Sequence, residues 1–580
     1  MQVRRAYAAL RLRDFATVDG FLDTKPDAFV HGLEPAMKIA KLYAYRDRRI
    51  EALAIAYEAR RRFSDDPSVH LDYMSIVINA ERPDGPDPLL PDVVGDDTAV
   101  HIQDAGGTAE WYIIENRPDD RRPNEILPGH RLAASLFGHR AGDEVTVKQD
   151  EYVTEKVIIK AVTSKYVYAF QESGRTYQRL FPETPGMWTF RVGAPGSEPG
   201  LDDFQPLFDM ITRQSEHSKQ VFDLYRNNQL PLGVVSSLTG NDIIATWSRA
   251  MSPAIGLRSC SGVPADLADA KQLANASKRV AIDPISILTV QSLSCREALV
   301  DRFGKFLVAQ STVDWLHNAI YEQRHKPASG YMTVGRENGQ FLRYDITPED
   351  IDRHIALLER VQSWVDANCI VSPVDAALTY GRAHRDRFDE MMPTSFVDTL
   401  LLASGDDVTL YSDDMMLRML ANGEYSKKGV WTQALLDVML DEKVITAEQY
   451  AGDVIQLASA NYNLTHVSAD VIMYAAEVAD WRPVHPFSTI ADSLSGLKCD
   501  EPSALFVATE VIYRITNQRL MDHQKAFLLN AVISSACRLR QPVRMLRALA
   551  TRVQAKFRLH PFGASEALGA IEAWSIAHII

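Results

Sequence analysis

Apolar residues recur at helical spacing through the first 80 residues of the chain. The pattern is clear over residues 6–12 and again over 37–45, where each predicted helix has one apolar face. Small residues in the segment that follows share one helix face, where a second helix can approach closely: Ala52, Ala56 and Ala59. Pro67 ends this helix, because proline cannot continue the hydrogen-bonded backbone. Residues 1–80 are therefore predicted to form packed helical hairpins.

A proline-dense linker is predicted at residues 81–88, and the composition changes after it. Short segments rich in β-branched and aromatic residues predict strands at 111–114, 144–147 and 156–160. Residues 132–138 predict a short helix between the first two strands, and a Gly-Asp turn leads into the second strand. This order favours a small α+β domain over about residues 95–195.

Three further regions follow a second linker, which glycine and proline predict at residues 191–200. Residues 203–278 are predicted to be a mostly helical connector, with the apolar stretch at 230–235 as a short exception. Over residues 279–480 strand and helix patterns alternate, which is typical of a layered α/β domain. Residues 481–580 are predicted to form a helical C-terminal region.

Acidic residues come directly after two predicted strands of the α/β region. Asp283 ends an apolar strand, and Asp413 and Asp414 follow the strand at 408–411. Open parallel sheets bind ligands outside the carboxyl ends of their strands, so these side chains are expected at a binding edge. An aspartate before a helix is also a common N-cap, and capping stays open for Asp283 and for one of the other two.

Two more acidic residues lie in predicted helices that can pack beside this edge. Asp314 belongs to the helix after a strand at 306–309, and Asp398 lies in the apolar helix at 395–403. A charge in an apolar helix is costly unless it is paired or bound to a metal. A solvated helix face stays open for Asp314, and a structural salt bridge stays open for Asp398.

Together these carboxylates predict a site for a hard divalent cation, Mg²⁺ or Mn²⁺, which takes oxygen ligands. The predicted catalytic residues are Asp283, Asp314, Asp398 and Asp414, and Asp413 is a further candidate metal ligand. Carboxylates crowded around one or two cations can activate a water and stabilise the leaving oxygen in phosphodiester hydrolysis. Neither a histidine pair with metal-ligand spacing nor a GxxxxGK[ST] phosphate loop occurs in the chain.

The order of the four catalytic candidates resembles the PIN nuclease family. In that family an Asp follows the first strand, an acidic residue lies on a helix after the second, and an "xxDxLLLA" helix precedes a "[ST]-[DN]-D-xx-L" turn. Asp283, Asp314, Asp398 and Asp414 match these positions. The resemblance implies a divalent-metal-dependent endonuclease acting on nucleic acid, on RNA rather than DNA. Asp314 departs from the usual Glu, so an adaptor that keeps the PIN fold without activity is the alternative.

Residues 127–147 resemble the C-terminal domain of the Gre transcript-cleavage factors, which has a short helix followed by "GxxxGDxV". The resemblance implies an FKBP-like fold and a docking role on RNA polymerase or another large machine. The acidic-tipped Gre coiled coil has no counterpart in the sequence, so transcript cleavage is not implied.

Residues 1–80 resemble a tetratricopeptide-type array, with a generic helical bundle as the alternative. The combination of repeat, Gre-like and PIN-like modules resembles predicted effectors of bacterial conflict or antiphage systems. That resemblance implies a regulated, toxin-like nuclease.

Composition and charge restrict the compartment and the partners. A formal charge of -14 argues against a surface covered by nucleic acid, although it leaves room for a local basic groove. None of the 5 cysteines lies in a CxxC pair, which predicts a reducing compartment without a zinc or disulfide framework. The start of the chain lacks a signal-peptide pattern and no long apolar run occurs, so a cytoplasmic protein without a membrane partner is predicted.

A basic tract runs over residues 538–558 and could grip a phosphate backbone. A solvated helix face paired with acidic neighbours is the favoured interpretation of this tract.

Overall fold

The computed structural model describes residues 2–79, 89–116, 122–149, 154–181, 200–324, 326–327, 329–337, 339–380, 382–496 and 498–579. The predicted linker at 81–88 and residues 191–199 of the linker predicted at 191–200 lie outside the described residues. The chain divides into two compact units, one made mainly of residues 1–207 and the other mainly of residues 208–580.

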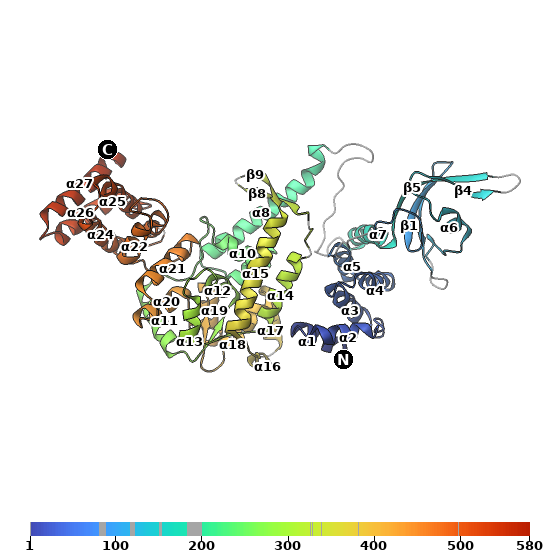
Figure 1. The fold of residues 1–580 in the computed structure, drawn as a ribbon, viewed down its shortest axis with the longest axis horizontal. Coiled ribbons are helices and arrows are strands. Elements are labelled where there is room, and N and C mark those ends of the chain that lie inside the picture. Colours follow the sequence, from blue (N-terminus) through green and yellow to red (C-terminus); the bar gives the residue numbers. More distant parts are fainter. Residues whose placement is uncertain are drawn as a thin grey trace. The chain divides into compact units, whose positions relative to one another are not determined.

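The first unit opens with antiparallel helices, as the apolar periodicity predicts (Figure 1). Neighbouring helices pack against one another through a shared core of alanine, leucine and tyrosine side chains. The prediction that Pro67 ends a helix is wrong: the preceding helix already ends at Arg62, and Pro67 begins the next one, where its missing N–H costs nothing. The helices are α1 (Gln2–Arg11), α2 (Phe15–Asp23), α3 (Leu33–Tyr45), α4 (Arg49–Arg62) and α5 (Pro67–Asn79).

The remainder of this unit is a five-stranded sheet with two helices, in the strand order β3-β2-β1-β5-β4. The predicted strands and the predicted short helix are confirmed, whereas β1 and α7 were not expected. Ser164 caps the start of α7, whose tyrosines and valine otherwise favour a strand. The elements are β1 (Thr98–Asp104), β2 (Ala109–Ile114), β3 (Glu125–Ile126), α6 (Arg131–Leu136), β4 (Glu144–Gln149), β5 (Thr154–Ser164) and α7 (Lys165–Leu180).

Buried polar contacts join the helices of the first unit to its sheet. The Glu115 carboxylate accepts hydrogen bonds from the Tyr57 hydroxyl at 2.9 Å and the Lys165 Nζ at 2.7 Å. The Arg61 guanidinium donates to the Glu125 carboxylate, and both side chains are almost fully buried. Removing one partner of such a pair leaves an uncompensated buried charge, so these contacts fix the helices against the sheet.

The second unit contains a parallel sheet with the strand order β10-β7-β6-β11-β12. The three strands predicted before the acidic residues are β6, β7 and β11, and all three are confirmed. The edge strands β10 and β12 are too short to produce a pattern. The strands are β6 (Arg279–Ile282), β7 (Phe306–Val308), β10 (Cys369–Val371), β11 (Val408–Tyr411) and β12 (Gly429–Val430).

Helices surround this sheet, and a separate antiparallel hairpin lies between α14 and α15 in the sequence (Figure 1). The hairpin is β8 (Tyr331–Glu337) with β9 (Gln340–Ile346). The helices are α11 (Pro264–Ala276), α12 (Pro284–Val290), α13 (Arg296–Phe303), α14 (Gln310–Arg324), α15 (Pro348–Asn368), α16 (Ala376–Thr379), α17 (Arg382–Met391), α18 (Thr394–Ala403), α19 (Met415–Tyr425), α20 (Thr432–Asp441) and α21 (Ala447–Ser459).

The connector before the parallel sheet is helical, and the exception predicted at 230–235 is wrong. A helix begins at Leu232, directly after Pro231, and its apolar run is buried. A short apolar run without periodicity is equally compatible with a buried strand and a buried helix, which explains the error. The connector consists of η1 (Leu201–Phe204), α8 (Gln205–Arg226), α9 (Leu232–Thr239) and α10 (Ile243–Ala250).

The C-terminal part is helical, as predicted, and its apolar residues belong to the same continuous core as those of the parallel sheet. These elements are α22 (Ala469–Val478), α23 (Phe487–Ala491), η2 (Asp492–Leu494), α24 (Glu501–Asn517), α25 (Asp522–Cys537), α26 (Pro542–Lys556) and α27 (Pro561–His578). Within the described ranges, none of the helices combines the length and the apolar character needed to cross a membrane.

Candidate functional site

Asp283 lies at the carboxyl end of β6 and is fully buried. It caps α12, because its Oδ1 accepts the Ser286 N–H at 2.7 Å, and its Oδ2 accepts the Ser412 hydroxyl at 2.7 Å. Burial raises the pKa of this carboxyl to about 7, and the hydrogen bonds from the two serines only partly oppose that rise. The predicted capping role is therefore confirmed, and the Asp283 carboxyl keeps its proton up to a higher pH than an exposed aspartate does.

Asp414 lies at the carboxyl end of β11 and is also fully buried. Its Oδ1 caps α19 by accepting the Met416 N–H at 3.0 Å, and its Oδ2 accepts the N–H of Leu232 from the connector. Burial raises the pKa of Asp414 to about 6. Capping is thus confirmed for this aspartate as well.

Asp413 occupies the same turn but points to a different set of partners. Its carboxylate accepts the Thr432 N–H at 2.8 Å, the Thr432 hydroxyl at 2.6 Å and the hydroxyl of Tyr462. Burial raises the pKa of Asp413 above its ordinary value, whereas these hydrogen bonds lower it. No helix cap accounts for this residue, which instead ties α20 and the loop after α21 to the sheet edge.

Two serines connect Asp283, Asp413 and Asp414 through hydrogen bonds. We call these three aspartates the acidic network. The Ser412 Oγ donates to Asp283 and accepts the Asp414 N–H at 3.1 Å. The Asp413 N–H donates to the Ser286 Oγ at 2.7 Å. The structure therefore brings together the carboxylates that the sequence placed after β6 and β11.

Asp314 lies near the start of α14, which follows the neighbouring strand β7, and Asp398 lies in the middle of α18. The Asp398 carboxylate accepts the Ser311 hydroxyl at 2.7 Å and forms an ion pair with Arg385 at 2.8 Å. Asp314 is half-buried, and its Oδ1 accepts the Gln310 side-chain amide at 3.0 Å. The salt bridge predicted as an alternative for Asp398 is thus confirmed, and its partner comes from α17.

A divalent cation needs several oxygen ligands close to one another. Buried carboxylates without a cationic partner, such as Asp283, are the oxygen ligands that Mg²⁺ and Mn²⁺ prefer. In the part of the chain that the structure describes, however, no three acidic, histidine or cysteine side chains are grouped as a metal site. The residue types fit a hard cation, and assembling them around one requires Asp398 to exchange Arg385 for it. The assignment of all five aspartates as metal ligands stays a prediction.

Several residues of this region escaped the sequence analysis. Tyr462 reaches Asp413 across 49 residues and Ser311 reaches Asp398 across 87, so no local pattern links them. Arg385 belongs to a basic stretch at residues 382–387, which was the one available sign of a counter-ion.

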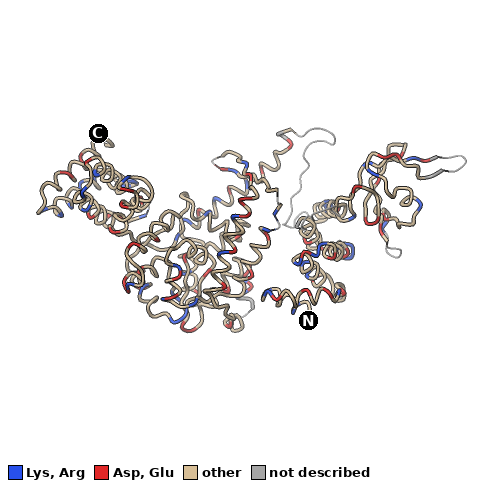
Figure 2. Tube along the Cα trace, viewed as in Figure 1, with Lys and Arg blue, Asp and Glu red and all other residues tan. Residues whose placement is uncertain are grey.

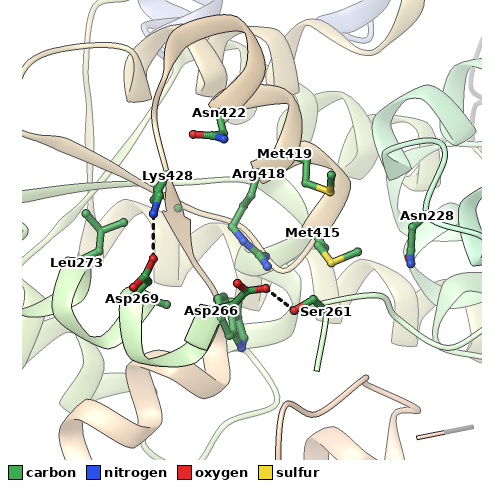
Figure 3. Close-up of a pocket in the computed structure, with 13 residues that line it drawn as sticks. Asn228, Ser261, Asp266, Asp269, Leu273, Met415, Arg418, Met419, Asn422 and Lys428 are labelled. Atoms are coloured by element: carbon green, nitrogen blue, oxygen red, sulfur yellow. Dashed lines mark hydrogen bonds and ion pairs between the residues drawn. The ribbon is translucent and has the colours of Figure 1, made fainter. Parts of the chain in front are cut away.

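A cavity of about 480 Å³ lies beside the acidic network, between α11, α19 and β12 (Figure 3). Arg418 borders the cavity, and its guanidinium donates to the backbone oxygens of Ser412 and Ser259. The same guanidinium lies 4.7 Å from the centre of the Trp431 ring. At its rim the Asp269 carboxylate pairs with Lys428 at 2.9 Å. None of the five predicted aspartates lines this cavity, which is therefore adjacent to the predicted site and not part of it.

Basic residues of the C-terminal helices are interspersed with acidic ones (Figure 2). In the tract at 538–558, Arg544 pairs with Glu501 at 2.8 Å and Lys556 with Glu510 at 2.8 Å. The tract is also not one helix, since α25 ends before it and α26 begins at Pro542. These pairs agree with the favoured interpretation of a paired, solvated helix face.

Comparison with known proteins supports a PIN domain in this region. Residues 281–423 match a family model described as the PIN domain associated with the TPR-GreAB-C-PIN system. The match covers roughly a quarter of the chain and contains all five predicted aspartates. No curated protein and no solved structure matches the chain. The PIN resemblance is thus confirmed for this segment, and the tetratricopeptide-like and Gre-like assignments stay predictions.

Proposed function

We propose that the PIN domain of this chain is a nuclease that hydrolyses phosphodiester bonds in RNA with the help of Mg²⁺ or Mn²⁺. The observation that carries the proposal is the acidic network, in which Asp283, Asp413 and Asp414 are linked by hydrogen bonds at the carboxyl edge of the parallel sheet. Asp283 and Asp414 follow adjacent strands, joined through Ser412, and Asp314 and Asp398 lie on helices that begin or pack beside the next strand. PIN domains are generally nucleases, and nucleic acid is therefore the proposed substrate class.

The residues proposed to hold the cation are Asp283, Asp398 and Asp414, with Asp314 and Asp413 as further ligands. A bound cation would supply an activated water and stabilise the leaving oxygen of the scissile phosphodiester. In the metal-free chain burial raises the pKa of Asp283 to about 7, and a bound cation would favour the ionised carboxylate that serves as its ligand. Ser286 and Ser412 orient its two oxygens toward fixed positions.

Arg385 is proposed to substitute for the cation when none is bound. Its guanidinium neutralises Asp398 at 2.8 Å and is only 31% exposed. A cation and a guanidinium compete for the same carboxylate because both need its lone pairs. Assembly of the site is therefore proposed to include release of Arg385 from Asp398.

A second function, a PIN-fold adaptor without hydrolysis, is favoured by one specific observation. Each carboxylate of the acidic network already accepts hydrogen bonds from the protein, and Asp398 is paired. Such a network can stabilise the fold without a metal. Retention of cation binding distinguishes the two functions, since an adaptor does not need it.

Cleavage of labelled RNA and single-stranded DNA by the full-length chain, with Mn²⁺, with Mg²⁺ and with chelator, tests the proposal. The wild-type chain is expected to cut RNA with cation alone and to gain thermal stability from Mn²⁺. Asp283→Asn and Asp398→Asn should each abolish both effects, whereas the exposed Asp301→Asn is the matched control that should retain them. Absence of cleavage together with absence of a Mn²⁺ shift would establish the adaptor instead.

We further propose that the first unit directs the nuclease to its target, with RNA polymerase or another large machine as the docking partner. The matched family model is named after a system that combines TPR, GreAB-C and PIN modules, which supports this division of roles. A regulated, toxin-like role in bacterial defence follows as part of the same proposal. Failure of the full-length chain to retain purified RNA polymerase in a pull-down would remove the polymerase as the partner.

A further inference from the structure

A second cavity of about 490 Å³ lies within the larger unit. Its walls come from the end of α8, the loop after α10, the loop after α21 and the segment between η2 and α24. Cavities of this size accommodate small organic ligands such as a mononucleotide. The lining is distinguished by its charge: it contains Arg226, Arg258 and Lys498, and no carboxylate among the described residues.

The positive charge of this lining is only weakly neutralised. The Arg258 guanidinium donates to the backbone oxygen of Arg226, through Nε at 3.1 Å and Nη2 at 2.8 Å, and no acidic side chain among the described residues pairs with it. Arg226 and Lys498 pair with carboxylates outside the cavity, at 3.1 and 2.8 Å, and these pairs are partly exposed. Exposed ion pairs contribute little and exchange readily, so the guanidinium and ammonium groups remain accessible to an anion.

Neutral polar groups complete the lining. Thr465 is a half-buried residue of the lining. Asn227 adds an exposed side-chain amide, and Pro253 and Ile255 provide apolar surface.

We propose that this cavity binds a phosphate-bearing ligand of mononucleotide size. Arginine and lysine from separate chain segments converge on it, which is the arrangement that recognises phosphate oxygens. The apolar side chains and Asn227 suit the remainder of a nucleotide. The phosphate comes either from a free nucleotide or from the backbone of an RNA chain, and both sources present the same chemistry.

One residue of the lining is bonded to the acidic network. Tyr462 lines the cavity and donates its hydroxyl to Asp413. The flanking Asn461 and Asn463 exchange backbone hydrogen bonds with Leu257, at 2.9 and 2.8 Å. A ligand in the cavity therefore contacts the loop that positions the Asp413 carboxylate.

Isothermal titration calorimetry with the full-length chain, in chelator so that hydrolysis plays no part, tests this proposal independently of nuclease activity. The probes are AMP, inorganic phosphate, adenosine and a short single-stranded RNA without terminal phosphates. AMP is expected to bind one-to-one and adenosine roughly tenfold more weakly or worse, because loss of the phosphate removes the charge-assisted hydrogen bonds. Saturable binding of RNA alone identifies the backbone as the phosphate source and supports the same chemistry.

Variants localise the binding. Arg258→Gln and Lys498→Gln are each expected to lower the affinity for AMP by about tenfold, since each removes one charged donor. Arg547→Gln, an exposed arginine on α26 outside the cavity, is the matched control and should bind as the wild type does. Lys498→Gln decides the result where Arg258→Gln lowers the melting temperature.

Three outcomes overturn the proposal: no probe binds, adenosine binds as tightly as AMP, or both cavity variants bind like the wild type.

Discussion

Replacing Asp283 by asparagine is expected to stabilise the metal-free protein at alkaline pH. The carboxyl is fully buried, and burial raises its pKa from the ordinary 3.8 to about 7. A rise of this size corresponds to about 4 kcal/mol of folding free energy lost when the group is ionised. Asparagine has nearly the same shape, keeps an oxygen for the Ser286 N–H and carries no charge to desolvate.

The pH dependence has a defined sign. Because the folded protein binds the Asp283 proton more tightly than the unfolded chain does, this group lowers the free energy of unfolding as pH rises from about 4 to about 7. Below about pH 4 both states are protonated and the contribution of the group disappears. The stabilising effect of Asp283→Asn should therefore be greatest, about 1–4 kcal/mol, near pH 8 and close to zero near pH 4.

Urea unfolding followed by tryptophan fluorescence, in chelator, measures this difference. The transition of the larger unit, which contains Trp315, Trp364 and Trp431, is compared between wild type and variant at several pH values. The exposed Asp301→Asn variant controls for a general loss of negative charge. A variant that is less stable than the wild type near pH 8, or a difference that does not change with pH, would refute the reasoning.

Three further changes test other contacts. Ser412→Ala removes the hydroxyl that donates to a buried carboxylate and is expected to cost about 2 kcal/mol in urea unfolding; a cost below about 0.5 kcal/mol contradicts the network. Arg385→Gln frees Asp398 and is expected to tighten Mn²⁺ binding, measured by calorimetry, and unchanged or weaker binding counts against competition. Arg61→Gln strands the buried Glu125 carboxylate and should destabilise the first unit by about 3–5 kcal/mol, which hydrogen exchange of its amides would detect; unchanged protection there would show that the pair is dispensable.

Local patterns predicted the elements that carry the acidic residues. Asp283 stands at the junction of an apolar strand with a proline-initiated helix, and both signals are short-range, so the strand and the helix were predicted together. The stretch at 230–235 was misassigned because a buried helix and a buried strand look alike over six residues. Capping of α12 and α19 was predictable for the same local reason, since the aspartates precede the helices directly.

The environment of each carboxylate was not predictable. Asp398 obtains its counter-ion from Arg385 on another helix, and Asp413 obtains a hydroxyl from Tyr462 far along the chain. Such partners are set by how the helices pack on the sheet, and no spacing in the sequence encodes them. The same holds for the basic cavity, whose arginines and lysine come from three separate segments.

The position of Mn²⁺ in crystals of the full-length chain, located by its anomalous scattering, tests the central claim most directly. The account predicts an ion coordinated by carboxylate oxygens of Asp283 and Asp398, at about 2.0–2.3 Å, with Arg385 displaced from Asp398. An ion bound elsewhere, or no ion while the Arg385–Asp398 pair stays intact, would contradict the claim that these aspartates form a hydrolytic centre.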